Sequence, residues 1–181
     1  EEQKKKYVPK LASGEFLGAY SLSEAGSGTD AAAMVAKATD DGEHFTLNGE
    51  KMWVTNGTTA DLFVLFAKVA DHPDYGKKSH GGVTCFIIEK GFEGFEIGKK
   101  EDKLGIRSSD TCTLVLNNCK VPKENVLGEV GKGFPIAMNA LDNSRIGIAA
   151  QGLGIAQGAY EAALKYSKER ETFGKPIGAH Q

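Results

Sequence analysis

The sequence has few of the features that would assign a ligand class or a compartment. No stretch approaches the roughly 20 consecutive apolar residues of a membrane-spanning helix, and Glu1-Glu2-Gln3 does not resemble the start of a signal peptide. The three cysteines, Cys85, Cys112 and Cys119, form no Cys-x-x-Cys pair, and the four histidines show no metal-ligand spacing. Buried thiols in a reducing compartment are the better interpretation, and no metal site is indicated.

Excess charge of either sign is also missing. The 22 basic and 24 acidic residues give a formal net charge of -2, which argues against a large nucleic-acid surface. The run Lys4-Lys5-Lys6 is short and typical of a solvated surface. With 181 residues, 40% of them hydrophobic and 25% charged, the chain is globular and long enough for one domain or one and a half.

The stretch Lys51–Gly57 carries the first functional hint. Asn48-Gly49 separates it from Phe45–Asn48, and Asn-Gly between two β-favouring runs predicts a hairpin with a type I′ turn. Strand alternation places Trp53 and Thr55 on one face, with Met52 and Val54 on the other. An indole beside a hydroxyl suits a planar heteroaromatic ligand. The alternative, which this stretch alone favours, is that Trp53 belongs to the core.

A loop rich in small residues, Ser23–Asp30, precedes that stretch. Gly26 and Gly28 carry no side chain that would keep a ligand away from the backbone, and Thr29 or Asp30 could cap a short turn at 31–33. The loop is neither a Walker A motif nor Gly-x-Gly-x-x-Gly. Taken alone, it is a weak indication of binding.

Short strands separated by turn residues dominate the region from residue 16 to 121, and they predict an antiparallel sandwich or barrel. Residues 71–82 carry Pro73, three glycines and several charges, which indicates an exposed loop. The expected strands are 16–22, 35–39, 45–48, 51–55, 62–67, 83–88, 95–97 and 111–121.

From Gly133 to Glu169 the pattern is helical, and before it residues 1–14 read as a helical end. The long helix is apolar on many sides, so it should be buried by further helices outside this chain or by oligomerisation. Asp142 and Arg145 share one face, either as a surface ion pair or as a handle for an anionic ligand. Arg170 could grip a phosphate or simply satisfy helix carbonyls.

Five motifs in this order resemble the acyl-CoA dehydrogenase family. They are Tyr20–Asp30, Leu47–Asn56, Lys103–Asp110, Val121–Leu127 and Arg170–Gly174. The resemblance is greatest to the short-chain and short/branched-chain members, and it implies an α+β chain. Residues 1–14 would end an N-terminal helical domain, 15–128 would form a middle antiparallel β-barrel, and 129–181 would begin an all-α C-terminal bundle.

The resemblance implies FAD as cofactor and an acyl-CoA thioester as substrate, dehydrogenated between Cα and Cβ. Thr29 would contact the pantetheine, and Asp142 and Arg145 the CoA. Arg170, Thr172 and Gln181 would hold the FAD diphosphate region across a dimer interface. The flavin would be lined by Tyr20, Leu22, Ser23, Trp53, Val54 and Thr55.

The resemblance also implies that the catalytic base is absent from this chain. Most members carry a glutamate beyond the position of Gln181, and a minority place it at Ser144, which cannot take the proton without its own base. Glu24 lies in the first of these motifs and Asp142 lies at one of the CoA-contacting positions, but neither is assigned as the base.

The implied partners are electron-transfer flavoprotein as acceptor and further copies of the chain in a dimer of dimers. The implied location is the mitochondrial matrix, or alternatively a bacterial cytoplasm. Two other functions remain open: an acyl-CoA oxidase that uses O₂, and a non-catalytic CoA- or lipid-binding module on the same scaffold.

Overall fold

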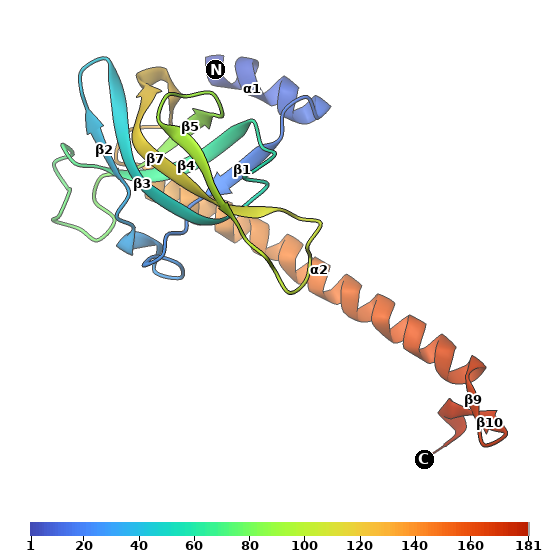
Figure 1. Ribbon diagram of the computed structural model, residues 1–181. Helices are drawn as coiled ribbons and strands as arrows, with labels where there is room; N and C mark the ends of the chain where they lie inside the picture. Colours follow the sequence, from blue (N-terminus) through green and yellow to red (C-terminus); the bar gives the residue numbers. More distant parts are fainter. Residues whose placement is uncertain (181) are drawn as a thin grey trace. The chain divides into compact units, whose positions relative to one another are not determined.

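The structure, a computed structural model, describes residues 1–180 (Figure 1). The chain divides into two compact units, the first from Glu1 to Ala137 and the second from Met138 onward. Within the described residues, no helix is both long and apolar enough to cross a membrane. Gln181, a predicted FAD contact, lies outside the described residues.

The first unit begins with helix α1 (Glu2–Ser13), as expected, which ends at Gly14 in a left-handed conformation. Two 3₁₀ turns, η1 (Ala31–Ala33) and η2 (Lys123–Asn125), join strands of one sheet. The strands are β1 (Gly18–Ser21), β2 (Lys37–Asp40), β3 (His44–Thr55), β4 (Leu62–Val69), β5 (Val83–Glu89), β6 (Phe95–Lys100), β7 (Thr111–Pro122) and β8 (Val126–Leu127).

The sheet is mixed, which corrects the purely antiparallel expectation. β4 pairs in parallel with both β1 and β2, through Gly18 opposite Leu62 and Lys37 opposite Lys68. The segments between these partners are long enough for the crossovers that parallel pairing requires. Within residues 1–180 the order is β6-β7-β3-β2-β4-β5-β8, with β1 beside β4, so the sheet is open and the expected closed barrel is not confirmed.

The expected hairpin at Asn48-Gly49 is wrong, because both residues lie inside the continuous strand β3. Asn48 instead fastens an irregularity in β7: its side-chain oxygen accepts a hydrogen bond from the Asn118 backbone N–H at 2.9 Å. Gly49 has φ of +142°, and a Cβ built there would lie 2.9 Å from Ala36. The glycine therefore permits close approach between neighbouring strands rather than a chain reversal.

The core of the first unit is apolar and lies against the sheet. It includes Phe45, Leu47, Phe63 and Phe86, each less than a tenth exposed. The three cysteines are buried and free, as expected, and burial raises the pKa of Cys85 to about 12. No thiolate chemistry is therefore expected at that position.

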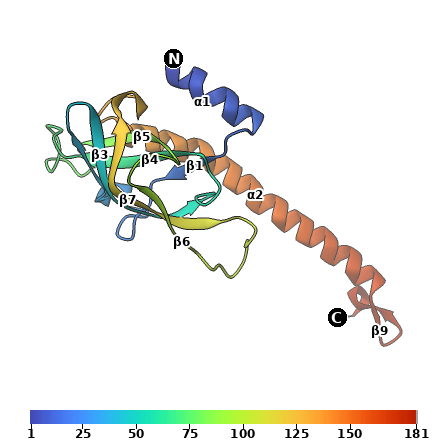
Figure 2. The same cartoon turned by 45° about the horizontal axis from the view of Figure 1, so that its top comes forward.

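The helix predicted over residues 133–169 is confirmed as α2 (Gly133–Glu169) (Figure 2). It is followed by β9 (Glu171–Thr172), β10 (Lys175–Pro176) and the 3₁₀ turn η3 (Ile177–Ala179). Phe173 and Gly174 join β9 to β10 with φ of +51° and +76°. A type I′ turn needs positive φ at both of its central residues. Phe173 and Gly174 meet this requirement, so a tight β-hairpin lies between β9 and β10.

Candidate functional site

The loop between β1 and β2 folds on itself through short-range hydrogen bonds. Glu24 and Ser27 exchange backbone bonds at 2.9 and 3.1 Å, and the Ser27 hydroxyl donates to the Asp30 carbonyl at 2.8 Å. A Cβ added at Gly26 or Gly28 would meet nothing within 4 Å. The tip of the loop is therefore open to a ligand. The 3₁₀ turn expected at 31–33 forms, but Asp30 makes no side-chain cap bond to it.

A buried ion pair ties this loop to β3. The Lys51 ammonium lies 2.6 Å from a Glu24 carboxylate oxygen and donates to the Leu22 carbonyl at 3.1 Å. Lys51 has no exposed side-chain surface and Glu24 has 4%. Burial lowers the pKa of Lys51, and the attraction of the Glu24 carboxylate opposes that shift. The other Glu24 oxygen accepts the Val35 backbone N–H at 2.6 Å.

Next to Lys51, strand β3 contains a bulge. Lys51 pairs with Leu114 and Val54 with Cys112, so β3 has one residue more than β7 between these rungs. The Met52 N–H turns away from the ladder and donates to the Ser23 carbonyl at 2.8 Å. Trp53 takes φ of +56°, a conformation that side-chain-bearing residues rarely adopt.

The bulge leaves the Trp53 side chain 59% exposed, whereas Val54 is buried at 1%. Thr55 is exposed as well, so neither the indole nor the hydroxyl of the expected pair lies in the core. No side-chain hydrogen bond joins the hydroxyl of Ser23 or Thr55 to another group in residues 1–180. An apolar ring with free hydroxyls beside it fits a planar ligand that carries ring nitrogens and oxygens.

The turn after Thr55 is held by Asp110. The Asp110 carboxylate accepts the Thr58 backbone N–H at 2.8 Å and the Thr58 hydroxyl at 2.6 Å. The Thr58 hydroxyl bond and the backbone bond lower the pKa of Asp110. Gly57 is required in this turn, because a Cβ there would overlap the Cys112 sulfur. The end of β3 is thus fixed on both sides of Thr55.

The other predicted flavin contacts in the first unit differ in exposure. Tyr20 is partly exposed and packs edge-on against Phe66 at 5.4 Å, and burial raises its pKa to about 12. Leu22 is buried, so mainly its backbone is available, and its carbonyl is occupied by Lys51. Ser23 is half-buried. The structure brings Ser23 next to the Met52-Trp53 bulge, and the role of each residue stays a prediction.

Thr29, the predicted pantetheine contact, is exposed near the open loop tip. Glu24 lies in the same loop. Because its carboxylate is already engaged by Lys51 and two backbone N–H groups, it is not free to act as a base.

In the second unit, Asp142 and Arg145 are exposed and 3.8 Å apart, beside a hollow of about 480 Å³. Ser144 lines the same hollow, and its hydroxyl donates to the Leu141 carbonyl rather than facing a base. Arg170 lies just beyond the C-terminal end of α2. At about 1.5 Å per residue, the helix separates Arg170 from Asp142 by roughly 40 Å.

Thr172 lies in β9 and contacts His180, whose ring nitrogen is 3.3 Å from the Thr172 hydroxyl and 3.0 Å from its carbonyl. The second unit therefore does not bring Asp142 and Arg145 together with Arg170 and Thr172. If both pairs bind ligand, they bind different parts of it.

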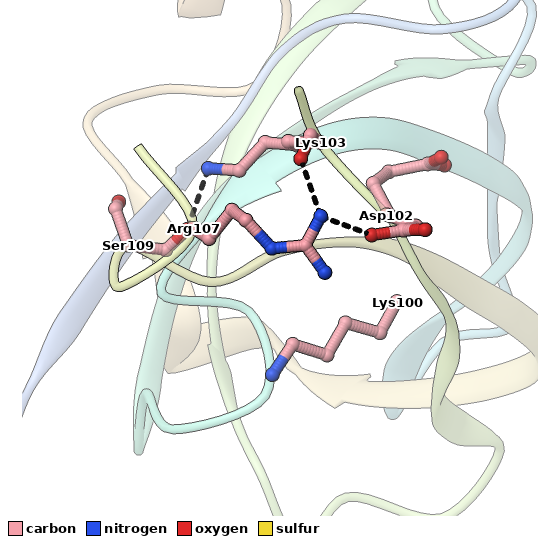
Figure 3. A pocket seen from close by; sticks show the side chains of 6 residues that line it. Lys100, Asp102, Lys103, Arg107 and Ser109 are labelled. Atoms are coloured by element: carbon pink, nitrogen blue, oxygen red, sulfur yellow. Dashed lines mark hydrogen bonds and ion pairs between the residues drawn. The ribbon is translucent and has the colours of Figure 1, made fainter. Parts of the chain in front are cut away.

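A charged loop at residues 101–110 received no role from the sequence (Figure 3). The Lys103 ammonium donates to the Ser109 carbonyl and to the Thr111 hydroxyl, and Thr111 pairs with Thr55 across the β3–β7 ladder. Arg107 donates to the Lys103 carbonyl at 2.9 Å and lies 2.8 Å from Asp102. Asp102, Lys103, Arg107 and Ser109 line a hollow of about 300 Å³.

Sequence reasoning also missed the burial of Lys51. Simple alternation places it on the same face as Trp53 and Thr55, and only the bulge turns it inward. The only signal in the sequence for this burial is a possible charge pair between Glu24, in the motif 20–30, and Lys51, in the motif 47–56. Within the described residues, no group of three potential ligands could hold a metal ion.

The chain belongs to the acyl-CoA dehydrogenase family. Residues 19–119, more than half of the chain, match the family's middle domain, and residues 131–181 match its C-terminal domain. A short-chain-specific acyl-CoA dehydrogenase of Clostridium acetobutylicum is 52% identical over all of this chain and 46% of its own length. The mitochondrial short/branched-chain-specific acyl-CoA dehydrogenase of Rattus norvegicus is 48% identical over 98% of this chain and 40% of its own.

Solved structures agree. An acyl-CoA dehydrogenase of Bacillus anthracis complexed with FAD gives a TM-score of 0.91 at 42% identity, over 99% of this chain and 30% of its own. A chain solved in work on the electron transferring flavoprotein of Acidaminococcus fermentans gives a TM-score of 0.92 at 50% identity. The match covers 99% of this chain and 46% of that chain. This chain spans about half the length of the curated relatives that it matches.

Proposed function

We propose that these residues form part of the FAD and acyl-CoA site of a dehydrogenase that introduces an α,β double bond into a short or branched acyl-CoA. The supporting observation is the exposed Trp53 indole at the β3 bulge, with the uncommitted hydroxyls of Ser23 and Thr55 nearby. When bound, FAD would supply the two-electron acceptor. Tyr20, Leu22, Ser23 and Val54 would complete its surroundings, with Thr29 on the acyl-CoA side.

In this proposal the residues of this chain bind and orient, and none of them removes the α-proton. Asp142 and Arg145 would hold the CoA. Arg170 and Thr172 would hold the FAD diphosphate region of a second copy, which accommodates their distance from Asp142 along α2. The proposed domain extents are 1–14, 15–128 and 129–181.

Electron-transfer flavoprotein is the proposed acceptor, because the indole edge at the bulge is open to solvent and a similar solved chain comes from work on such a flavoprotein. Assembly as a dimer of dimers is proposed from the exposed apolar surface of α2. The relatives include mitochondrial and bacterial proteins, so either the matrix or a bacterial cytoplasm would suit.

The test uses the natural protein that carries this sequence. Purified protein should be yellow, and butyryl-CoA or a branched acyl-CoA added without oxygen should bleach the flavin bands. Electron-transfer flavoprotein should then restore the colour faster than O₂ does. A colourless protein would favour a CoA- or lipid-binding module, and rapid peroxide formation would favour an oxidase.

The 181-residue chain alone, mixed with FAD and butyryl-CoA, should show no sustained bleaching, because none of its carboxylates is assigned as the base. The Asp110 carboxylate, in the turn after Thr55, is engaged by the Thr58 N–H and hydroxyl. Glu24 is held by Lys51, and Asp142 lies beside Arg145. Rapid turnover by this chain would contradict the assignment of the base to another segment.

A further inference from the structure

The buried Glu24–Lys51 pair has more partners than an isolated ion pair needs. Together the two side chains contact the backbone at Leu22, Val35 and Ala36. These three contacts fasten both ends of the β1–β2 loop to β3. Inside the loop the bonds between Glu24 and Ser27 are short-range, and the Lys68 ammonium of β4 donates to the Ala32 carbonyl at 2.8 Å.

The position of the pair along β3 is equally specific. Lys51 is the last residue before the bulge, and the next backbone N–H, that of Met52, donates to the Ser23 carbonyl at 2.8 Å. Trp53, which follows, has an unfavourable φ of +56°. A strained conformation persists only where its surroundings over-determine it, and the Lys51 and Met52 bonds to the loop do this here.

We infer that Glu24 and Lys51 are positioning residues for the flavin: their buried pair holds the β1–β2 loop against the β3 bulge and so sets the Trp53 indole and Ser23 at the spacing that the ring requires. This inference rests on the proposed function. Neither residue touches the ring itself, and both act through Ser23 and Trp53.

A purely structural pair would behave differently from a positioning pair. Removing one charge of a buried pair strands the other, whereas removing both can leave stability nearly unchanged. A double substitution should therefore restore the fold. It would not restore the contacts of Leu22, Val35 and Ala36, so loop placement would stay lost.

The experiment compares Lys51→Met, Glu24→Met and the double variant in the natural protein, because methionine fills a similar volume and can neither donate nor accept the bonds to Leu22, Val35 and Ala36. Urea unfolding measures stability, and titration of apoprotein with FAD measures affinity. We expect both single variants to lose stability and the double variant to recover most of it. All three should bind FAD at least about tenfold more weakly, with altered flavin absorption bands. Lys123→Met, which breaks an exposed pair with Asp40, should leave FAD binding and the bands unchanged.

Hydrogen exchange adds a readout that does not need the single variants to fold. In the double variant, peptides that cover residues 22–36 and 51–56 should lose protection, while those from β4 and β5 keep it. FAD affinity and flavin bands that recover with stability in the double variant would overturn the inference while leaving the proposed function intact. A wild-type protein that binds no FAD would overturn both.

Discussion

At the residue scale, Trp53 combines an exposed indole with a backbone conformation that favours glycine. We predict that Trp53→Gly will change the stability of the apoprotein by no more than about 2 kcal/mol, because relief of the positive φ offsets the loss of the buried part of the indole and the added freedom of the unfolded chain. FAD affinity should fall, since the flat apolar surface is gone. The midpoint of urea unfolding measures the change in stability, and titration of the apoprotein with FAD measures the change in affinity.

Ile106→Gly is the matched control, since Ile106 also has positive φ, +51°, and an exposed side chain. It should gain stability without weakening FAD binding. A large loss of stability in Trp53→Gly would mean that the indole is part of the packed core rather than a ligand surface.

Gly49 illustrates how one missing side chain shapes a strand pair. We predict that Gly49→Ala will destabilise the protein by about 1–3 kcal/mol, because the new Cβ would lie 2.9 Å from Ala36 at a positive φ. Gly28→Ala, where a Cβ would meet nothing within 4 Å, should be close to neutral. Equal effects of the two substitutions on thermal unfolding would contradict the close approach of β2 and β3.

At the element scale, the turn after β3 should be sensitive to acid. The pKa of Asp110 is lowered because Thr58 donates to its carboxylate. A carboxyl group with a lowered folded-state pKa adds stability above its unfolded-state pKa, near pH 4 (about 3.9 for Asp). That contribution is lost as pH falls through the folded-state value.

The stability difference between wild type and Asp110→Asn should therefore shrink on acidification below about pH 4. Denaturation midpoints measured across that range check this. Thr58→Val removes the donating hydroxyl and should reduce the pH dependence. A difference between wild type and Asp110→Asn that stays constant with pH would show that the carboxylate bonds do not stabilise the turn.

The elements themselves differ in how far the sequence revealed them. The α2 boundaries follow from periodicity and from the absence of proline after Pro135, which are local signals. The register irregularities of β3 are set by β7 and by the β1–β2 loop, which lie far away in sequence. The turn predicted at Asn48-Gly49 is therefore wrong. Asn48 binds the Asn118 backbone, and Gly49 allows the close approach of Ala36.

The candidate site divides in the same way. Alternation along β3 separated Trp53 and Thr55 from Val54, and the structure exposes the first two and buries the third. The core position that this stretch alone favoured for Trp53 is wrong, because its side chain is exposed. The inward turn of Lys51 and the role of Lys103 beside Thr111 depend on tertiary contacts, and no local pattern indicated them. The sequence therefore did not reveal the buried ion pair and the hydrogen bonds that fix the position of the exposed residues.

At the scale of the whole molecule, α2 displays apolar side chains that no described residue covers. Ile146 and Leu153 are 74% and 72% exposed, and Ile148 and Ile155 are similar. We predict that the 181-residue chain alone will self-associate and bind a hydrophobic dye, because an exposed apolar surface of this kind drives association. Sedimentation and dye fluorescence measure these properties.

Ile146→Gln with Leu153→Gln should lower both association and dye binding while helical circular dichroism is retained. As a control, Glu161→Gln changes a polar position of the same helix, whose partner is the Gln157 amide. A monomeric wild-type chain that binds no dye would show that this surface is covered in solution by other means.

The Glu24–Lys51 contact also bears on how such a protein can diverge. A variant that loses one member of the pair leaves the other as an uncompensated charge in the protein interior. Selection then favours a second substitution that removes the remaining charge. Among natural variants, these two positions should thus mutate in concert or hardly at all, while the exposed Lys123 and Asp40 drift independently.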